Sequence, residues 1–225
     1  MPGVSVCYRI LYIALEPVDP AWEYNFRKAA IEIIKNLIFN KDRRRQEIRI
    51  RKNQRVQADL ARYGGRILKS DEMEHAFRQT HHTVSTVGEH TIRVAKTSLK
   101  ICYALHKIRI PTDIAAVVTG ALSHDLGILG RDEKFETMRQ CSVQHPVDSV
   151  EVARNIVGEL PDKTNDIIAR HMWPVGGTKP PNSLEGAVVS MADKIATVVD
   201  FAKGCQQKRL GLKDTIQDKI LREKG

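Results

Sequence analysis

The stretch from residue 114 to residue 127, IAAVVTGALSHDLG, decides the fold class of this 225-residue chain. Apolar residues follow one another at intervals of three or four, which is typical of one face of an α-helix: Ile114, Val117 and Ala121. His124 continues this stripe and is therefore expected to point toward the core. Asp125 adds a carboxylate at the same buried helix end. The stretch thus predicts a helix that carries two ionisable groups inward.

Similar periodicity extends over most of the chain and predicts an all-α protein. We expect helices over 22–63 (one long helix or two abutting ones), 90–106, 111–125, 146–158, 162–173, 182–203 and 213–222, and a short strand or packed strip within 4–15. Gly64-Gly65 is expected to end the first helix, outside the main core, and Pro146 to open the fourth as its first residue. The chain divides into an N-terminal extension with a long basic helix (1–70), a central domain (71–203) and a basic C-terminal helix (204–225).

The composition is that of an ordinary globular protein, with 42% hydrophobic and 28% charged residues. The longest early apolar stretch, Val4 to Leu15, is short and broken by Arg9, so neither a transmembrane span nor a signal peptide is expected and no membrane partner is predicted. The cysteines are too widely spaced for a disulfide framework or a CxxC zinc site: Cys7, Cys102, Cys141 and Cys205. These features predict a reduced, cytoplasmic protein.

The net charge of +9 is concentrated in two segments. Residues 41–66 contain ten Lys or Arg against three Asp or Glu, and residues 203–225 contain seven against three. Such a charge run is usually the solvated face of a helix, and this interpretation is favoured. The run at 41–66 could instead bind nucleic-acid phosphates or steer a polyanionic nucleotide toward a site in the central domain.

Further ionisable residues occupy apolar faces. His90 lies on a stripe with Val94 and Leu105, Asp193 shares a face with Val189, and His171 closely follows Ile167 and Ile168. A single buried histidine is more often an ordinary core residue. Several imidazoles and carboxylates together are costly to bury, and a divalent cation would compensate them by supplying positive charge and accepting nitrogen lone pairs.

The order of these residues along the chain, with His90 first, then His124-Asp125 and then Asp193, also resembles the pattern of a known family. The resemblance lies in Val87–Ala95 (VGEHTIRVA), Ala121–Gly127 (ALSHDLG) and Met191–Lys194 (MADK), which together look like the H…HD…D pattern of the HD-domain metal-dependent phosphohydrolases. It covers roughly residues 71–203 and implies an HD-domain helical bundle. The segment Ala169–Pro174 (ARHMWP) also resembles a subgroup of small uncharacterised bacterial HD proteins.

The resemblance implies a metal site residue by residue. His90, His124, Asp125 and Asp193 would hold a first divalent cation, and Asp125 would bridge to a second. His145 and His171, the only histidines between the HD pair and the final Asp, would complete a binuclear site. A mixed imidazole and carboxylate set suits Mn²⁺, Fe²⁺, Co²⁺, Ni²⁺ or Zn²⁺. A mononuclear site is the alternative.

The catalytic expectations follow from such a site. Asp125 would hold metals that generate hydroxide from water, while Lys194 and Arg131 would neutralise charge on the phosphate. In several members a lysine closely follows the HD-x-G turn, whereas here the first cation after Gly127 is Arg131.

We therefore expect a metal-dependent phosphohydrolase, either a phosphomonoesterase or a phosphodiesterase, that cleaves a nucleotide or another small phosphorylated metabolite. Two alternatives stay open. One is a metal-dependent HD nuclease that uses the basic helix at 41–66, and the other is a non-catalytic HD module that binds a metal or ligand in signalling. The sequence is compatible with an oligomer.

Overall fold

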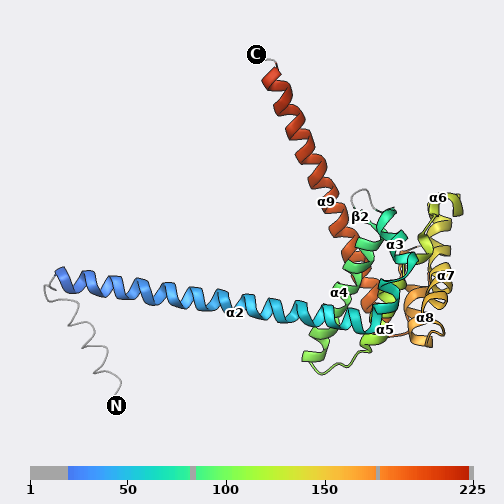
Figure 1. Ribbon diagram of the computed structural model, residues 1–225, viewed down its shortest axis with the longest axis horizontal. Coiled ribbons are helices and arrows are strands. Elements are labelled where there is room, and N and C mark those ends of the chain that lie inside the picture. Colours follow the sequence, from blue (N-terminus) through green and yellow to red (C-terminus); the bar gives the residue numbers. More distant parts are fainter. Residues whose placement is uncertain (1–19, 82–84, 176–177, 223–225) are drawn as a thin grey trace. The chain divides into compact units, whose positions relative to one another are not determined.

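The computed structural model describes residues 20–81, 85–175 and 178–222, most of which lie in helices (Figure 1). The elements are α2 (Pro20–Leu68), α3 (Asp71–Arg78), β1 (Thr80–His81), β2 (Ser85–Thr86), α4 (Val87–Lys107), α5 (Ile114–Ser123), the 3₁₀ helix η1 (Leu126–Ile128), α6 (Arg131–Lys134), α7 (Met138–Val157), α8 (Asp162–Arg170) and α9 (Leu184–Arg222). The prediction of an all-α fold is confirmed. The strand expected within 4–15 lies outside the described residues.

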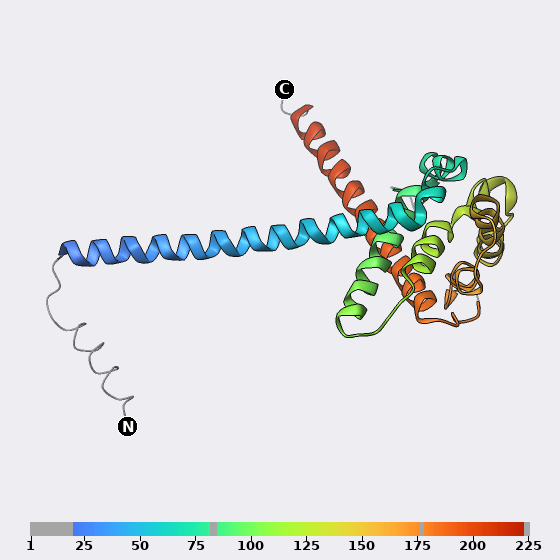
Figure 2. The same ribbon diagram turned by 60° about the horizontal axis from the view of Figure 1, so that its bottom comes forward.

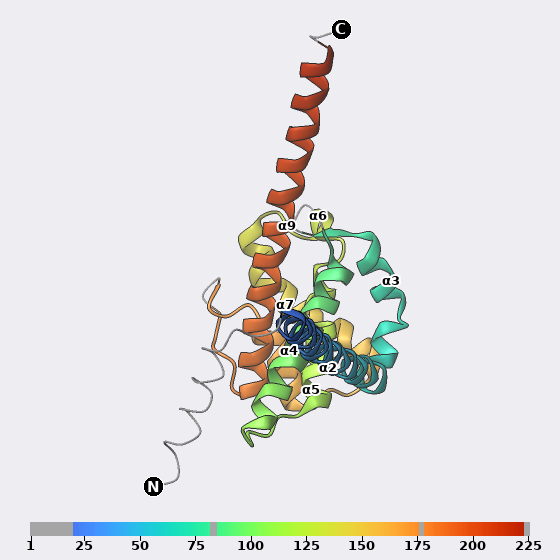
Figure 3. The same ribbon diagram turned by 90° about the vertical axis from the view of Figure 1, so that its left-hand side faces the viewer.

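Residues 1–53 and 54–225 form separate compact units. In the second unit, α4 packs against α5 and α9, α5 packs against α8, and α7 packs against η1. Figure 2 shows these helices gathered into one bundle, and Figure 3 shows the first part of α9 lying beside α4. The buried apolar core includes Leu99, Leu122, Ile167 and Val189. None of the helices in the described ranges combines the length and the apolarity needed to cross a bilayer.

Side-chain caps set where the helices of the bundle begin. Thr86 forms a capping box with Glu89 at the start of α4, and Asp113 accepts a hydrogen bond from the Ala116 N–H at the start of α5. Thr137 caps α7 by accepting from the Gln140 N–H. The prediction that Pro146 opens this helix is therefore wrong, because Pro146 lies inside α7, well after its cap.

The C-terminal part of α2 belongs to the core of the second unit. The helix continues through Gly64-Gly65 to Leu68, and Val56, Leu60 and Ile67 are buried. The predictions that the glycines end this helix, and that it lies outside the main core up to residue 63, are therefore wrong. A Cβ atom at Gly64 would lie 2.2 Å from Leu122 Cδ1, so this glycine allows α2 to pack closely against α5.

Two further differences from the sequence expectations concern short or terminal elements. The strands β1 and β2 pair in antiparallel fashion, with Thr80 opposite Thr86 and His81 opposite Ser85. This hairpin was not expected, and it holds the buried His81 next to the start of α4. The helices expected at 182–203 and 213–222 are one continuous helix, α9.

Gly127 is the position where close backbone packing is most restrictive. A Cβ atom there would lie 2.4 Å from both His145 O and Ser149 N, which are backbone atoms of α7. The Gly127 N–H also donates a hydrogen bond of 2.9 Å to Ser149 Oγ. Glycine at this position therefore allows η1 to pack directly on the backbone of α7, beside His145.

We expect Gly127→Ala to lower the free energy of unfolding by about 1–3 kcal/mol, because the backbone of α7 would have to move. Gly65→Ala is the matched control. Position 65 is helical and has no atom within 4 Å of the added Cβ, so alanine there should stabilise the protein by about 0.5–1 kcal/mol. Urea unfolding measures both changes. Equal stability of the two variants would contradict the packing described for Gly127.

Candidate metal centre

His124 and Asp125 lie directly after α5 and are both buried. His124 Nδ1 lies 2.8 Å from Ala121 O. Because a carbonyl oxygen only accepts, Nδ1 carries the proton and neutral His124 has its lone pair on Nε2. This Nε2 atom is buried without a hydrogen-bond partner among the described residues, and it lies 3.3 Å from Asp125 Oδ2. A lone pair that faces a carboxylate is the arrangement expected at a cation site.

His90 of α4 joins this pair to α9. Its Nε2 atom lies 2.9 Å from Asp193 Oδ1, and its Nδ1 atom lies 3.0 Å from Asp200 Oδ2. His90 and Asp200 are wholly buried, and Arg93, one turn after His90, forms an ion pair with Asp200. The carboxylate of Asp200 therefore fixes the orientation of the His90 ring and leaves Nε2 facing Asp193.

His145 of α7 and His171, which follows α8, approach Asp125 from its other side. Their Nδ1 atoms donate to Cys141 O at 2.7 Å and Ile168 O at 2.8 Å. Their Nε2 atoms lie 3.1 Å apart, and they lie 3.3 and 3.4 Å from Asp125 Oδ1. Two imidazole lone pairs repel each other at this distance unless a proton or a metal cation lies between them.

Asp125 is the centre of the cluster. Its Oδ2 atom faces His124 and lies 3.8 Å from Nε2 of both His81 and His90, whereas Oδ1 faces the pair His145 and His171. Three overlapping groups bring potential ligand atoms within 4.8 Å of one another: His81–His90–Asp125, His90–His124–Asp193 and His124–Asp125–His171. The donor set, with its unpartnered nitrogen, fits a divalent cation.

The pKa values of the histidines are shifted by burial and by their contacts within this cluster. Burial lowers the pKa of His90, but the hydrogen bond to Asp193 and the nearby carboxylate charges prevail and raise it to about 9. Burial also opposes protonation of His145, yet its hydrogen bonds to Asp125 and Cys141 raise the pKa to about 10. Burial lowers the pKa of His171, so this ring stays neutral. Without a metal ion, protons on His90 and His145 therefore supply the positive charge.

The pKa values of the two carboxylates, Asp125 and Asp193, are shifted downward. Burial raises the pKa of Asp125, but its electrostatic interactions with the surrounding His124, His145 and His171 outweigh burial and hold the pKa well below its usual range. Burial likewise opposes ionisation of Asp193, and the hydrogen bond from His90 outweighs it and lowers the pKa. Both groups are ionised at neutral pH.

The two expected phosphate-binding cations differ in position. Lys194 Nζ lies 2.8 Å from Asp193 Oδ2 and donates to His171 O at 2.8 Å, so this ammonium group lies at the edge of the cluster. Arg131 lies at the start of α6, and its side chain contacts Asp132 Oδ1 at 3.4 Å. In the described part of the chain, Arg131 makes no polar contact with the cluster.

Two buried residues of the cluster were not singled out from the sequence. His81 belongs to β1, which no periodicity predicted, and its ring centroid lies 4.9 Å from that of His90. Asp200 follows Asp193 by seven residues, which is two helical turns, so the two carboxylates lie on the same face of α9. The seven-residue spacing was the available signal for Asp200.

Comparison with known proteins identifies the class of protein. Residues 87–198 match the family model described as HD domain, and the matched segment contains the six expected metal ligands. The chain therefore carries an HD domain, which confirms the family resemblance of its sequence motifs. A search of curated proteins and a search of solved structures gave no significant match. Asp200 lies just beyond the matched segment.

We expect Asp200→Asn to weaken Mn²⁺ binding by roughly 10–100-fold, because His90 would lose the carboxylate that orients its ring. Asp132→Asn is the control, since the side chain of Asp132 is exposed and lies outside the cluster. Titration calorimetry of the metal-free protein measures the affinity. If both variants bound Mn²⁺ like the wild type, Asp200 would have no part in the centre.

Metal binding should strengthen as pH rises. At pH 6–8 the metal-free protein carries protons on His90 and His145, whose pKa values are about 9 and about 10. Metal ions that take the two Nε2 positions, one at each side of Asp125, displace one proton each, so the Mn²⁺ affinity of each position should rise by about tenfold per pH unit in this range. Calorimetry in buffers of different ionisation enthalpy counts the released protons. Binding without proton release would contradict the assignment of these histidines as ligands.

Proposed function

We propose that this protein is a metal-dependent phosphohydrolase that cleaves a phosphate ester of a nucleotide or another small phosphorylated metabolite. The observation that carries the proposal is the convergence on Asp125 of imidazoles from both sides. His124 and His90 face one carboxylate oxygen, and His145 and His171 face the other. A carboxylate that offers one oxygen to each of two ligand groups favours two divalent cations over one.

The proposed ligands are His90, His124, Asp125, His145, His171 and Asp193, and the donor set suits Mn²⁺, Fe²⁺, Co²⁺, Ni²⁺ or Zn²⁺. Divalent cations bound there would lower the pKa of a water molecule, so that hydroxide is available as the nucleophile, and bind the phosphoryl oxygens. The protein fixes the orientation of three of these histidine rings, because His124, His145 and His171 each donate Nδ1–H to a backbone carbonyl. This contact fixes each ring with Nε2 toward the centre.

The surrounding side chains have positioning and electrostatic roles in this proposal. Lys194 holds Asp193 through its Oδ2 atom and is one-third exposed, so part of its ammonium charge can reach a substrate phosphate. Arg131, also part-exposed, is proposed as a second cation that meets the phosphate after leaving Asp132. The burial of Asp125 excludes bulk water and strengthens each of these electrostatic interactions.

A nucleic-acid substrate is the second candidate, and the exposure of the basic run favours it. Residues 41–55 of α2 are all exposed, and Arg44, Arg49 and Arg51 form no ion pair within the described ranges. A solvent-exposed helix with this charge could contact several backbone phosphates. In this alternative the cleaved bond is a phosphodiester of DNA or RNA.

The experiment that tests the proposal compares the wild type, Asp125→Ala and the exposed control Asp71→Ala after metal removal and reloading with each of the five metals. Aryl phosphomonoesters, aryl phosphodiesters, a nucleotide panel and DNA and RNA oligonucleotides serve as substrates. We expect turnover of a small ester that Asp125→Ala lowers by at least about a hundredfold and that Asp71→Ala leaves unchanged.

Each other outcome has a definite meaning. Cleavage of oligonucleotides alone, lost on joint replacement of Arg43, Arg44 and Arg45 by alanine, would replace the proposal with the nuclease. Full turnover in Asp125→Ala would contradict the site. Metal binding without turnover of any substrate would favour the non-catalytic HD module.

A further inference from the structure

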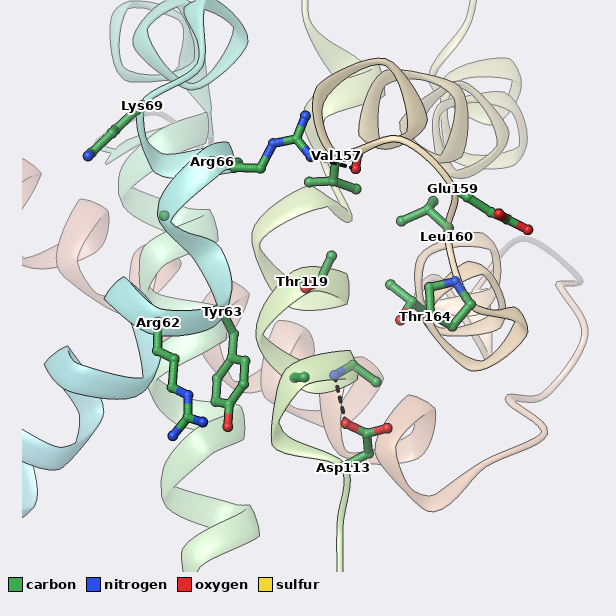
Figure 4. A pocket seen from close by; sticks show the side chains of 14 residues that line it. Arg62, Tyr63, Arg66, Lys69, Asp113, Thr119, Val157, Glu159, Leu160 and Thr164 are labelled. Carbon is green, nitrogen blue, oxygen red and sulfur yellow. Dashed lines mark hydrogen bonds between the residues drawn. The ribbon is translucent and has the colours of Figure 1, made fainter.

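A cavity lies in the second compact unit (residues 54–225), away from the metal centre (Figure 4). Its volume is about 560 Å³, and it is lined by the end of α2, the first half of α5 and the connection from α7 to α8. A volume of this size is typical of small-molecule sites. The cavity shares no residue with the histidine cluster.

One wall of the cavity carries uncompensated positive charge. Arg62 and Arg66 are four residues apart on one face of α2, and Lys69, which follows directly after the helix, lines the same wall. Among the described residues none of the three forms an ion pair. Arg66 Nη1 donates instead to Val157 O at 2.8 Å, and this neutral acceptor leaves the guanidinium charge unbalanced.

The two carboxylates that line the cavity do not neutralise this wall. Asp113 caps α5 by accepting from the Ala116 N–H, and it lies 3.9 Å from Lys163 Nζ. Figure 4 shows the Glu159 carboxylate directed away from the cavity. The cavity therefore has a positive potential that favours an anion.

The facing wall offers hydrogen-bond donors. Helix α8 begins at Asp162, and its N-cap residue, Pro161, provides no side-chain cap, so the first N–H groups have no side-chain acceptor. Thr164 in the first turn is only 2% exposed, and its hydroxyl makes no hydrogen bond within the part of the chain that the structure describes. Figure 4 shows this hydroxyl turned toward the cavity. A hydroxyl of a largely buried residue that is unpartnered among the described residues and accessible from the cavity, beside an uncapped helix N-terminus, is suited to an anionic oxygen.

Apart from Thr119, the remaining lining is mostly apolar. Tyr63, Leu160 and Pro161, with Val157 at the upper edge, provide apolar surface next to the charged and donor groups. We propose that the cavity is a binding site for an organic phosphate, whose phosphate is bound by the α2 cations and the α8 N-terminus while its uncharged part packs on these side chains. This site is separate from the metal centre and does not depend on the proposed hydrolysis.

The position of the cavity connects it to the centre through two helices. Helix α5 has Asp113 and Ala116 at the cavity and ends just before His124. Helix α8 has Thr164 at the cavity and ends just before His171. An occupant would therefore contact the first turns of the two helices whose last turns hold proposed metal ligands.

Titration calorimetry of the metal-free, full-length protein with adenosine 5′-monophosphate tests the proposal. Removal of metal keeps the HD centre from contributing a cation to phosphate binding. The double variant Arg62→Glu/Lys69→Glu should bind the probe at least about tenfold more weakly than the wild type, because two of the three cations would become anions. Lys100→Glu/Lys107→Glu is the matched control, because it reverses two exposed cations seven residues apart on α4, away from the cavity, and its affinity should equal that of the wild type.

A second variant and a second probe separate binding from a structural effect. Thr164→Val removes the hydroxyl while keeping the side-chain shape, so it should weaken binding several-fold without lowering the midpoint of thermal unfolding. Adenosine, which lacks the phosphate, should bind at least about tenfold more weakly than the monophosphate. The proposal is overturned if the wild type shows no binding at millimolar probe, if the two double variants lose affinity equally, or if adenosine binds as well as the monophosphate.

Discussion

The structure depends on one electrostatic constraint, which is the burial of ionised Asp125 and Asp193 in the middle of a helical bundle. Neither carboxylate is more than 6% exposed, and the pKa of each is lowered. Isolated buried carboxylates would be strongly unfavourable, so positive charge must accompany them. His90 of α4 and His145 of α7 provide it as protons in the metal-free protein, and the Nε2 atoms of these residues, of His124 and of His171 are arranged to bind metal cations.

A repeated local device holds these histidines in place. His124 and His171 donate Nδ1–H to the carbonyl three residues earlier, and His145 donates to the carbonyl four residues earlier. These carbonyls belong to the same helices, so each ring is oriented by its own element rather than by a long-range contact. His90 is the exception, since the buried Asp200 of α9 binds its Nδ1 atom. The HD centre is thus oriented partly by a residue beyond the matched family segment.

Much of the fold and of the candidate site could be predicted from the sequence because both follow helical periodicity. The stripe that contains His124, and the faces that contain His90 and Asp193, placed these side chains inward, and they converge in the structure. Periodicity could not reveal that Thr137 starts α7 before Pro146. It also could not show that Gly64 packs α2 against α5 rather than ending a helix, because that depends on a long-range contact with Leu122.

The remaining differences have similar physical causes. His81 comes close to His90 through a two-stranded hairpin too short to give an alternating pattern. The sequence does not indicate a role for Asp200, because a charged residue late in a helix is expected to be solvent-exposed. Its burial follows from its partners His90 and Arg93, which are far from it in sequence. The role of Arg131 was inferred from proximity in sequence to the HD pair, whereas its side chain contacts Asp132.

Anomalous diffraction from crystals grown with Mn²⁺ tests the central claim most directly, because it locates the metal independently of any activity. The account predicts strong anomalous density within coordination distance of Asp125, bounded by His90, His124 and Asp193 on one side and by His145 and His171 on the other. Two resolved peaks there would establish the binuclear form. Density only elsewhere on the protein, or an Asp125 carboxylate that still contacts the histidines alone at saturating Mn²⁺, would contradict it.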